Sequence, residues 1–323
     1  MKVGLSFTLD TTSREPSASA RLYGFMLEVA EEADRLGLDH LWYSEHHRWD
    51  GGHLTQPLAF CAAVAARTKH IRIGTGVVIA PFRSAQHLAE EAALADLISG
   101  GRFELAVGAG YRLPEFELFG AAMGQRYDAT DARVREVRSL LASGAVRPRP
   151  LQEPLPIWLG YQGPRGARRA GLLGEGLLSA SPASWPHYRA GLLEAGHPES
   201  TARMAGAFEG WISEDPEADW PLVSRHAALK YDTFRRHMVE GTGRDDPRPV
   251  DLERLRSSPL GDPMRYFLMA TPEEAAERIA ARVAGLPVVE IHIEAPMTDM
   301  DEARVLDHVT TVATRLRPLL EAR

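Results

Sequence analysis

Cysteine, blocks of basic residues and long apolar runs are all scarce in this sequence of 323 residues. The single cysteine, Cys61, excludes an internal disulfide and a zinc site built from several thiolates. The net charge of −7 and the lack of any basic block argue against nucleic-acid binding. No apolar run approaches the length that crosses a membrane, and Met1-Lys2 leads into a predicted strand rather than a signal peptide. We therefore expect a cytoplasmic protein that binds neither nucleic acid nor membrane.

The sequence does contain a regular alternation of short apolar segments and long amphipathic ones. The predicted strands are 3–7, 40–44, 71–79, 103–107, 157–159, 177–179, 203–212 and 288–293. The predicted helices are 21–36, 57–68, 85–98, 127–141, 165–173, 185–195, 218–239, 272–283 and 302–320. The strands are continuous apolar runs, as expected for a parallel sheet that is buried on both faces. Eight such units favour an α/β fold, a (β/α)8 TIM barrel as one domain over residues 1–323, with a doubly wound sheet as the alternative.

Residues 241–262 interrupt this alternation. They are rich in glycine, proline, aspartate and arginine, and they show neither a helical nor a strand period. We predict an irregular insertion loop here, which is either a lid over the site or a surface loop. The helix after it has a clear start, because Thr271-Pro272-Glu273-Glu274 combines a threonine cap with a glutamate three residues later.

The tetrapeptide Ser44-Glu45-His46-His47 follows the second predicted strand. In a TIM barrel, residues just past the carboxyl ends of the strands face the active site. Neighbouring residues on an extended chain point in opposite directions, so His46 and His47 are not expected to bind one metal ion. No other histidine or cysteine cluster has ligand spacing, and we predict no metal. One of the two histidines is expected to face the pocket as an acid, a base or a hydrogen-bond donor, and a capped strand end is the structural alternative.

Glycines mark the ends of the next two predicted strands. Gly74 and Gly76 lie in the third strand, and Gly108-Ala109-Gly110-Tyr111 follows the fourth. Glycine inside a strand indicates a bulge or the close approach of a ligand, although tight barrel packing also uses it. The Gly-x-Gly is not a dinucleotide fingerprint, because no third glycine follows at the required position.

A glycine-rich segment also follows the fifth predicted strand. It runs Gly160-Tyr161-Gln162-Gly163-Pro164-Arg165-Gly166 and leads into a helix. Free N–H groups and the positive end of a helix dipole form a general phosphate site. The segment therefore predicts either a phosphate site or a simple turn.

Taken together, these segments resemble the bacterial luciferase-like monooxygenase family. The resemblance rests on Glu45-His46-His47, Leu54-Thr55 with Pro57, the run from Arg67 to Thr75, Pro81, the run from Ala89 to Phe103, Gly108 with Gly110-Tyr111, Phe116-Glu117 with Phe119-Gly120, Pro154 with Pro156 to Gly160, and Thr271 to Ile279. It spans nearly the whole chain except 241–262, and residues 40–120 are its most specific part.

The resemblance implies a TIM barrel that binds FMN or the deazaflavin coenzyme F-420, and it places the catalytic histidine at His46. It also implies a non-prolyl cis peptide bond at Gly76-Val77 behind the flavin ring, and a phosphate site formed by 163–166 and Arg126. The residues expected to contact the cofactor are Glu45, Gly76, Val77, Ala109, Gly110, Tyr111, Arg126, Gly160, Tyr161, Gln162, Gly163 and Gly166. Phe7, Trp42 and Trp158 are expected either to wall the substrate pocket or to belong to the barrel core.

One position bears on the choice of cofactor. In luciferase itself an arginine follows the fourth strand and binds the FMN phosphate, whereas this chain has Ala109 there. Gly108-Ala109-Gly110-Tyr111 resembles the deazaflavin-using branch at least as well as luciferase. Glu45-His46-His47 and Leu54-Thr55 resemble the FMN branch. The prediction is therefore an FMN-dependent monooxygenase that uses reduced FMN and O2 to oxidise a small or medium organic substrate. An F-420-dependent oxidoreductase and a non-catalytic flavin-binding protein are the alternatives.

The resemblance also implies protein partners. A separate flavin reductase would supply reduced FMN. A homodimer would form through helices 57–68 and 85–98, which are rich in alanine and leucine, and a dimer with a subunit of different sequence is the alternative. Substrate contacts are expected from the loops 49–54, 112–125 and 241–262.

Overall fold

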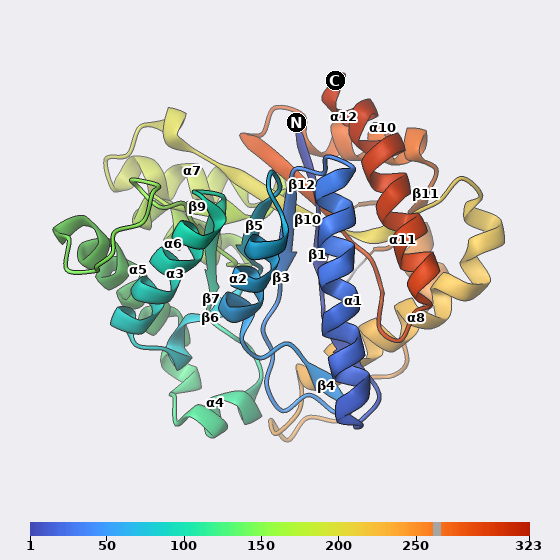
Figure 1. Ribbon diagram of the computed structural model, residues 1–323, viewed down its shortest axis with the longest axis horizontal. Helices are drawn as coiled ribbons and strands as arrows, with labels where there is room; N and C mark the ends of the chain where they lie inside the picture. The colour runs from blue at the N-terminus through green and yellow to red at the C-terminus, as the bar shows by residue number, and fades with distance from the viewer. Residues whose placement is uncertain (261–265) are drawn as a thin grey trace.

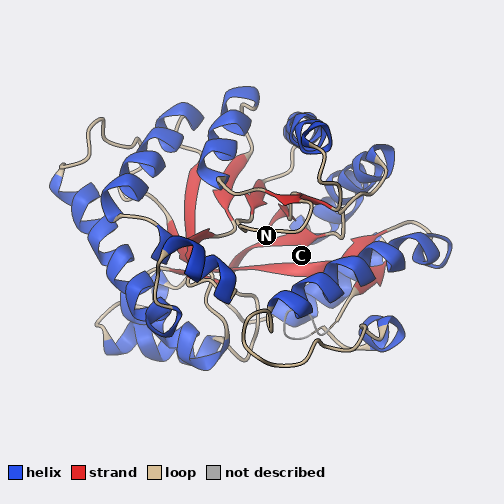
Figure 2. Cartoon of the chain, turned by 90° about the horizontal axis from the view of Figure 1, so that it is seen from below, coloured by secondary structure: helices blue, strands red, loops and turns tan. Residues whose placement is uncertain are grey.

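The computed structural model describes residues 1–260 and 266–323. At its centre is a closed barrel of parallel strands surrounded by helices (Figures 1 and 2). The eight barrel strands are β1 (Lys2–Phe7), β3 (His40–Tyr43), β5 (Arg72–Thr75), β7 (Phe103–Gly108), β8 (Ile157–Leu159), β9 (Gly176–Leu178), β10 (Met204–Ile212) and β12 (Val288–Glu294). The sheet closes because β12 pairs with both β1 and β10, and β10 also pairs with β9. The predicted TIM barrel is confirmed.

The helices follow the strands in the order that the sequence predicts. They are α1 (Pro16–Arg35), α2 (Pro57–Arg67), α3 (Ala85–Ser99), α5 (Arg126–Ser143), α6 (Gly163–Leu173), α7 (Trp185–Glu194), α8 (Pro216–His237), α10 (Pro272–Val283), α11 (Glu302–Thr311) and α12 (Arg317–Glu321). Thr271 and Glu274 form the predicted reciprocal cap at the start of α10. α1 starts earlier than predicted, with Pro16 in its first turn. None of the helices in the described ranges is long and apolar enough to cross a membrane.

Several short elements were not predicted from the sequence. β2 (Asp10–Thr11) and β4 (Gly52–His53) form a small antiparallel pair, and β11 (Leu268–Ala270) pairs with β10. α4 (Leu113–Phe119) lies in a segment predicted to be a loop. α9 (Leu252–Ser257) lies within the predicted insertion 241–262, where the Asp251 side chain accepts a hydrogen bond from the Arg254 N–H. The last two residues of that predicted insertion, Gly261 and Asp262, lie outside the described residues.

Inward-pointing side chains fill the barrel interior. Trp42 and Trp158 meet edge to face with ring centroids 6.3 Å apart, and they pack with Ala106 and Ala205. Each indole N–H donates to a buried glutamate side chain: the Trp42 indole to Glu290 at 2.7 Å, and the Trp158 indole to Glu104 at 2.5 Å. The side chains that alternate with these point outward and pack against the helices.

Burial of Glu290 leads to a testable pH dependence of stability. Burial raises the pKa of Glu290 to about 8, although the Trp42 hydrogen bond opposes the shift. Between pH 5 and 8 the folded protein therefore keeps a proton that the unfolded chain releases, so stability falls as the pH rises, by up to about 1.4 kcal/mol per pH unit. We expect Glu290→Gln to make this fall smaller, while the exposed Glu277→Gln leaves it intact; burial also raises the pKa of Asp10 to about 7, so Asp10 accounts for part of the fall that remains. Urea unfolding at pH 5, 6, 7, 8 and 9 measures it, and equal pH slopes for all three proteins would contradict the assignment.

Candidate active site

A cavity of ≈ 200 Å³ lies at the carboxyl ends of β3, β7 and β8. In Figure 1 these strand ends point toward α4 and β4, away from both chain termini. The cavity is lined by Ser44, Glu45, His46, Gly76, Val77, Ile79, Gly108, Ala109, Gly110, Tyr111, Tyr127, Gly160 and Gln162. These residues come from four successive barrel units, which the closed sheet brings to one side of the mouth.

The third strand is interrupted at the floor of this cavity. The Gly76-Val77 peptide bond is cis, as the resemblance implied, and it separates β5 from a short β6 (Val78–Ile79) that pairs with β7. The Val77 side chain lies between two glycines. A Cβ on Gly108 would be 2.5 Å from Val77 Cγ2, and a Cβ on Gly160 would be 2.6 Å from Val77 Cγ1. Both glycines are therefore required for this floor.

His46 faces the cavity and is held by a buried carboxylate. Its Nδ1 lies 3.2 Å from Glu115 Oε1, and the same oxygen accepts the His47 backbone N–H at 2.8 Å. Burial alone would raise the pKa of Glu115, but the hydrogen bonds from His46 and His47 and the charge of Arg112 lower it. Glu115 is therefore a carboxylate at neutral pH. Nε2 is the other ring nitrogen of His46, and it has no hydrogen bond to any residue in the described ranges.

Glu45 and His47 anchor the loop that carries His46. Glu45 Oε1 receives hydrogen bonds from His47 Nε2 and Arg83 Nη1, both at 2.7 Å, and Glu45 Oε2 accepts the Ile79 N–H at 3.0 Å. Glu45 still forms part of the cavity wall, but both its oxygens are occupied. This network ties the loop after β3 to the segment after β6.

A second cavity, of ≈ 530 Å³, adjoins the first and shares Tyr127 and Gln162 with it. Gly163, Pro164, Arg165, Gly166 and Arg169 complete its lining, at the start of α6. The cap residue Gln162 makes no side-chain hydrogen bond to the helix, which leaves the backbone N–H groups of Gly163, Arg165 and Gly166 available, whereas Pro164 has none. Gly166 is needed for packing, because a Cβ there would lie 2.9 Å from Tyr161 Cβ. A phosphate group fits this combination of helix start and arginine.

Some predicted residues lie elsewhere. Trp42 and Trp158 do not line either cavity, because both point into the barrel interior and their polar atoms are bonded to buried glutamates. Phe7 points outward, stacks on Tyr43 at 5.8 Å and borders a different cavity beside α1. Strand residues alternate between inside and outside, so Trp42 and Trp158 fill the barrel interior whereas Phe7 faces outward.

Two predicted cofactor contacts also lie outside the lining of both cavities. The Tyr161 hydroxyl donates to Asp131 at 2.7 Å, so Tyr161 packs beneath α6 as a support. Arg126 donates to the Met123 carbonyl and stacks over the Tyr127 ring at 4.8 Å. Arg126 is therefore in contact with a residue of the lining but is not part of it.

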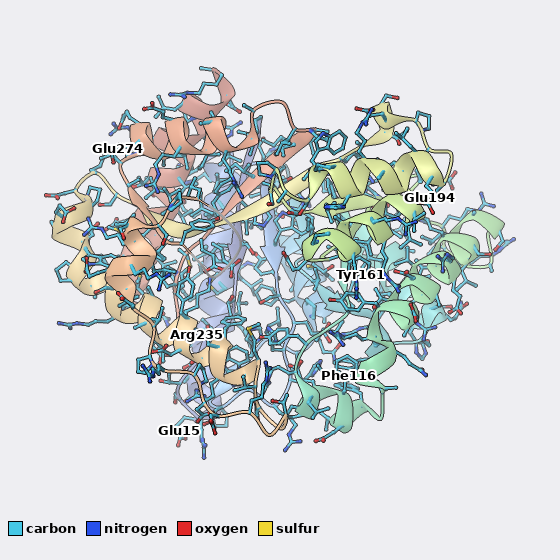
Figure 3. All side chains as sticks on the ribbon, turned by 180° about the vertical axis from the view of Figure 1, so that it is seen from behind. Glu15, Phe116, Tyr161, Glu194, Arg235 and Glu274 are labelled. Carbon is cyan, nitrogen blue, oxygen red and sulfur yellow. The ribbon has the colours of Figure 1, made fainter. Side chains whose placement is uncertain are left out.

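The sequence reasoning did not single out Glu115, Tyr127 or Arg169, and it included Arg165 only as part of the predicted phosphate site 163–166. Glu115 was hidden because residues 112–125 were predicted to be a loop. Pro114 followed by Glu115 is nevertheless typical of the first turn of a helix, and α4 begins there. Figure 3 shows Phe116 of α4 and Arg235 of α8 on opposite sides of this end of the barrel.

The cavity fits a flat ring with polar edges. Its floor is the Val77 region, where glycines allow close backbone approach. The Tyr111 hydroxyl is buried and has no hydrogen-bond partner among residues 1–260 and 266–323, so a ligand can supply one. With the α6 start next to it, the site fits a planar cofactor that carries a phosphate.

A comparison with known protein families shows to which of them the chain belongs. Residues 1–288 match the family described as luciferase-like monooxygenase. The chain belongs to this family. An F420-dependent glucose-6-phosphate dehydrogenase from Amycolatopsis mediterranei is 33% identical over 310 residues, covering 85% of this chain and 90% of the relative.

Luciferase-like relatives of this chain use two kinds of cofactor. The oxygenase component of a flavin-dependent trigonelline monooxygenase from Acinetobacter baylyi is 34% identical over 164 residues, which is 45% of this chain and 44% of the relative. Among solved structures, the monooxygenase RslO1 from Streptomyces bottropensis has a TM-score of 0.75 and 24% identity, covering 98% of this chain and 99% of that one. This luciferase-like protein is therefore an oxidoreductase by family, and its relatives include both F420-dependent and flavin-dependent enzymes.

Proposed function

We propose that this luciferase-like protein is an FMN-dependent monooxygenase that uses reduced FMN and O2 to oxidise an organic substrate. The observation that carries the proposal is the adjacency of three parts: the Val77 floor for a flat ring, the His46–Glu115 pair beside it, and the α6 start for a phosphate. The histidine–carboxylate pair favours an enzyme over a non-catalytic flavin-binding protein.

The motif after β3 supports FMN over F-420, because Glu45-His46-His47 and Leu54-Thr55 resemble the FMN branch of the family. The groove that continues from the second cavity does not distinguish the two cofactors, since Arg135, Arg168 and Arg169 line it together with Asp128 and Asp131.

A deazaflavin-dependent dehydrogenase is the second candidate. One observation favours it, namely that the relative matched over 85% of this chain is an F420-dependent glucose-6-phosphate dehydrogenase. In that case the same floor and the same histidine would serve hydride transfer without oxygen.

His46 is the proton-handling group of the proposed mechanism. When bound, reduced FMN supplies the activation of O2 and the electrons for oxygen transfer. A Glu115 carboxylate that accepts from Nδ1–H leaves Nε2 as the atom that takes up or delivers a proton in the cavity. Trp49, Tyr111 and Phe234 surround the imidazole with ring centroids 4.9 to 5.6 Å away, and they limit the access of water.

Protein partners follow from the same proposal. A flavin reductase would supply the reduced FMN, because nothing in the proposed mechanism reduces the flavin within this chain. We also propose a homodimer through α2 and α3, since α3 exposes Leu94 by 54% and Ile98 by 43%. Sedimentation at the mass of one chain, 35.5 kDa, would contradict the dimer.

The phosphate site can be tested by exchanging one arginine. We expect Arg165→Ala to weaken FMN binding by about tenfold, because Arg165 lies beside the free N–H groups at the start of α6 and a charge-assisted phosphate contact is strong. Arg168→Ala is the matched control, since Arg168 lies on the same helix but pairs with Glu194. Fluorescence titration with FMN and with F-420 measures both affinities. Tight F-420 binding together with weak FMN binding would overturn the FMN proposal in favour of the deazaflavin dehydrogenase.

A further inference from the structure

The cavity beside α1, of ≈ 210 Å³, lies on the outer side of the barrel. It is bounded by the end of β1, by β2, by α1 and by the start of α11, and the two helices lie side by side in Figure 1. This cavity shares no lining residue with the two cavities of the candidate active site. The proposed oxidation therefore leaves it without a role.

The walls of this cavity are mostly apolar. They are formed by Phe7, Leu9, Leu22, Phe25, Met26, Met297, Met300 and Val305. An apolar cavity of about 150 Å³ is large enough to bind benzene. The cavity beside α1 therefore has room for one ring with a short substituent, and its methionine side chains can adapt to the shape of such a molecule.

The cavity can be entered from solvent. Arg21 and Glu302 lie at its rim, and their side chains are exposed by 67% and 38%. They form a bidentate ion pair, in which Arg21 Nε donates to Glu302 Oε1 at 2.7 Å and Arg21 Nη2 donates to Glu302 Oε2. The charge of Arg21 is therefore balanced within the protein, so the rim does not favour an anionic ligand.

One buried carboxyl group forms the polar end of the cavity. Asp10 lines it and is 5% exposed. Asp10 Oδ1 accepts the Thr298 hydroxyl at 2.8 Å. Asp10 Oδ2 has no hydrogen-bond partner in any other residue of 1–260 and 266–323, and it is not one of the unpaired polar atoms that are fully enclosed there. This second oxygen is therefore available to a ligand in the cavity.

A second carboxylate adds to the negative charge at this end. Asp299 also lines the cavity, and its side chain accepts hydrogen bonds from the Thr11 hydroxyl at 2.8 Å and the Thr12 N–H at 3.1 Å. These are neutral donors, and Asp299 forms no ion pair within the described part of the chain. The charges that line the cavity therefore favour a cation.

No cation of the protein neutralises Asp10 directly. Burial raises the pKa of Asp10 to about 7, although the Thr298 hydrogen bond and the charge of Lys230 oppose the shift. Lys230 donates to Glu294 at 2.7 Å, so its ammonium group is already paired. At pH 8 Asp10 is mostly a carboxylate in an apolar cavity. Such a group is costly to bury, and a positively charged partner lowers the cost.

We propose that the cavity beside α1 is a second ligand site, which binds a compact apolar primary amine in its ammonium form. The apolar part lies between α1 and α11, and the ammonium group donates to Asp10 Oδ2. The walls select an apolar body, the volume limits it to about one ring, and the two carboxylates select a positive charge. This site does not depend on which cofactor the active site binds.

Calorimetry at pH 8 on the flavin-free protein tests the chemical class. Benzylamine is the probe, benzyl alcohol lacks its charge, benzoate reverses the charge, and ethylamine lacks the ring. We expect benzylamine to bind at least about fivefold more tightly than benzyl alcohol and at least about tenfold more tightly than ethylamine and benzoate. No binding of benzylamine, or an equal affinity for any of the other three molecules, would overturn the proposal.

Two variants assign the binding to this cavity. Asp10→Asn keeps the size of the side chain and removes its charge, so it should abolish the preference for benzylamine over benzyl alcohol, whereas the exposed Asp245→Asn should keep it. Ala18 lines the cavity and is half-buried, so Ala18→Phe fills the space from α1 and should weaken benzylamine binding by at least about tenfold. The exposed Ala20→Phe is the matched control on the same helix.

The outcomes of these variants can be separated from effects on folding and on the active site. If Asp10→Asn does not fold, the comparison of Ala18→Phe with Ala20→Phe still decides, and undiminished benzylamine binding by Ala18→Phe would overturn the proposal. Saturating FMN should leave benzylamine bound, because the cavities share no lining residue. Competitive displacement of benzylamine by FMN would place the amine in the active site instead. The measurements without flavin stand whether or not FMN binds, so this inference and the FMN proposal fail separately.

Discussion

Replacing His46 by glutamine should lower kcat by about 10²- to 10⁴-fold, while FMN affinity changes by less than about threefold. The expected loss is the usual contribution of a positioned acid–base group. His46 lines the cavity and presents Nε2 there, because Nδ1 is engaged by Glu115 at 3.2 Å. Glutamine keeps a polar side chain of similar reach but cannot exchange a proton near neutral pH. Substrate turnover with reduced FMN supplied by a reductase measures kcat, and flavin fluorescence measures binding.

Two further variants test whether the loss of kcat is specific to His46. His70→Gln removes an exposed histidine outside the site and should leave kcat unchanged. Glu115→Gln should give a smaller loss than His46→Gln, because it keeps the hydrogen-bonding shape and removes only the negative charge that orients the imidazole. Full turnover by His46→Gln would show that the proton is handled elsewhere.

The sequence reasoning predicted the parts of the site that depend on short-range order. The alternation of short apolar strands with long amphipathic helices predicted the barrel. The position of His46 past a strand end predicted that this residue faces the cavity. These features follow from local periodicity and from a general rule of the TIM barrel, so they can be predicted from one sequence alone. The glycines at 108 and 160 were likewise visible as breaks in strand propensity.

The rest of the site depends on contacts between distant segments. Glu115 meets His46 across 69 positions of the chain, and Glu45 receives the N–H of Ile79 across 34. Nothing local distinguishes Glu115 from a solvated glutamate at the start of a helix. For Trp42 and Trp158 the sequence left two alternatives open, because a large aromatic residue near a strand end suits a pocket wall or a core equally well. Only the register of the closed sheet decides that they fill the interior.

The Val77 floor should be the most sensitive part of the site to added volume. In Gly160→Ala the new Cβ would lie 2.6 Å from Val77 Cγ1, a distance that forces one group to move. Valine is stiff at χ1, so the side chain has no easy alternative position and its backbone must shift toward the cavity. We expect at least a tenfold loss of FMN affinity and a fall of roughly 1–3 kcal/mol in the free energy of unfolding. FMN titration and urea unfolding measure the two effects.

A second substitution, at Val77, should compensate for the clash that Gly160→Ala introduces. Val77→Ala removes both Cγ atoms, so the double variant Gly160→Ala with Val77→Ala should recover most of the FMN affinity that Gly160→Ala loses. Gly108→Ala should behave like Gly160→Ala and respond to the same rescue, because its Cβ would meet Val77 Cγ2 at 2.5 Å from the other side. Gly124→Ala is the matched control, since a Cβ there has no atom within 4 Å. If Val77→Ala failed to rescue either glycine variant, the glycines would act through their own backbone freedom instead of making room for Val77, and the floor would have to be assigned to the backbone alone.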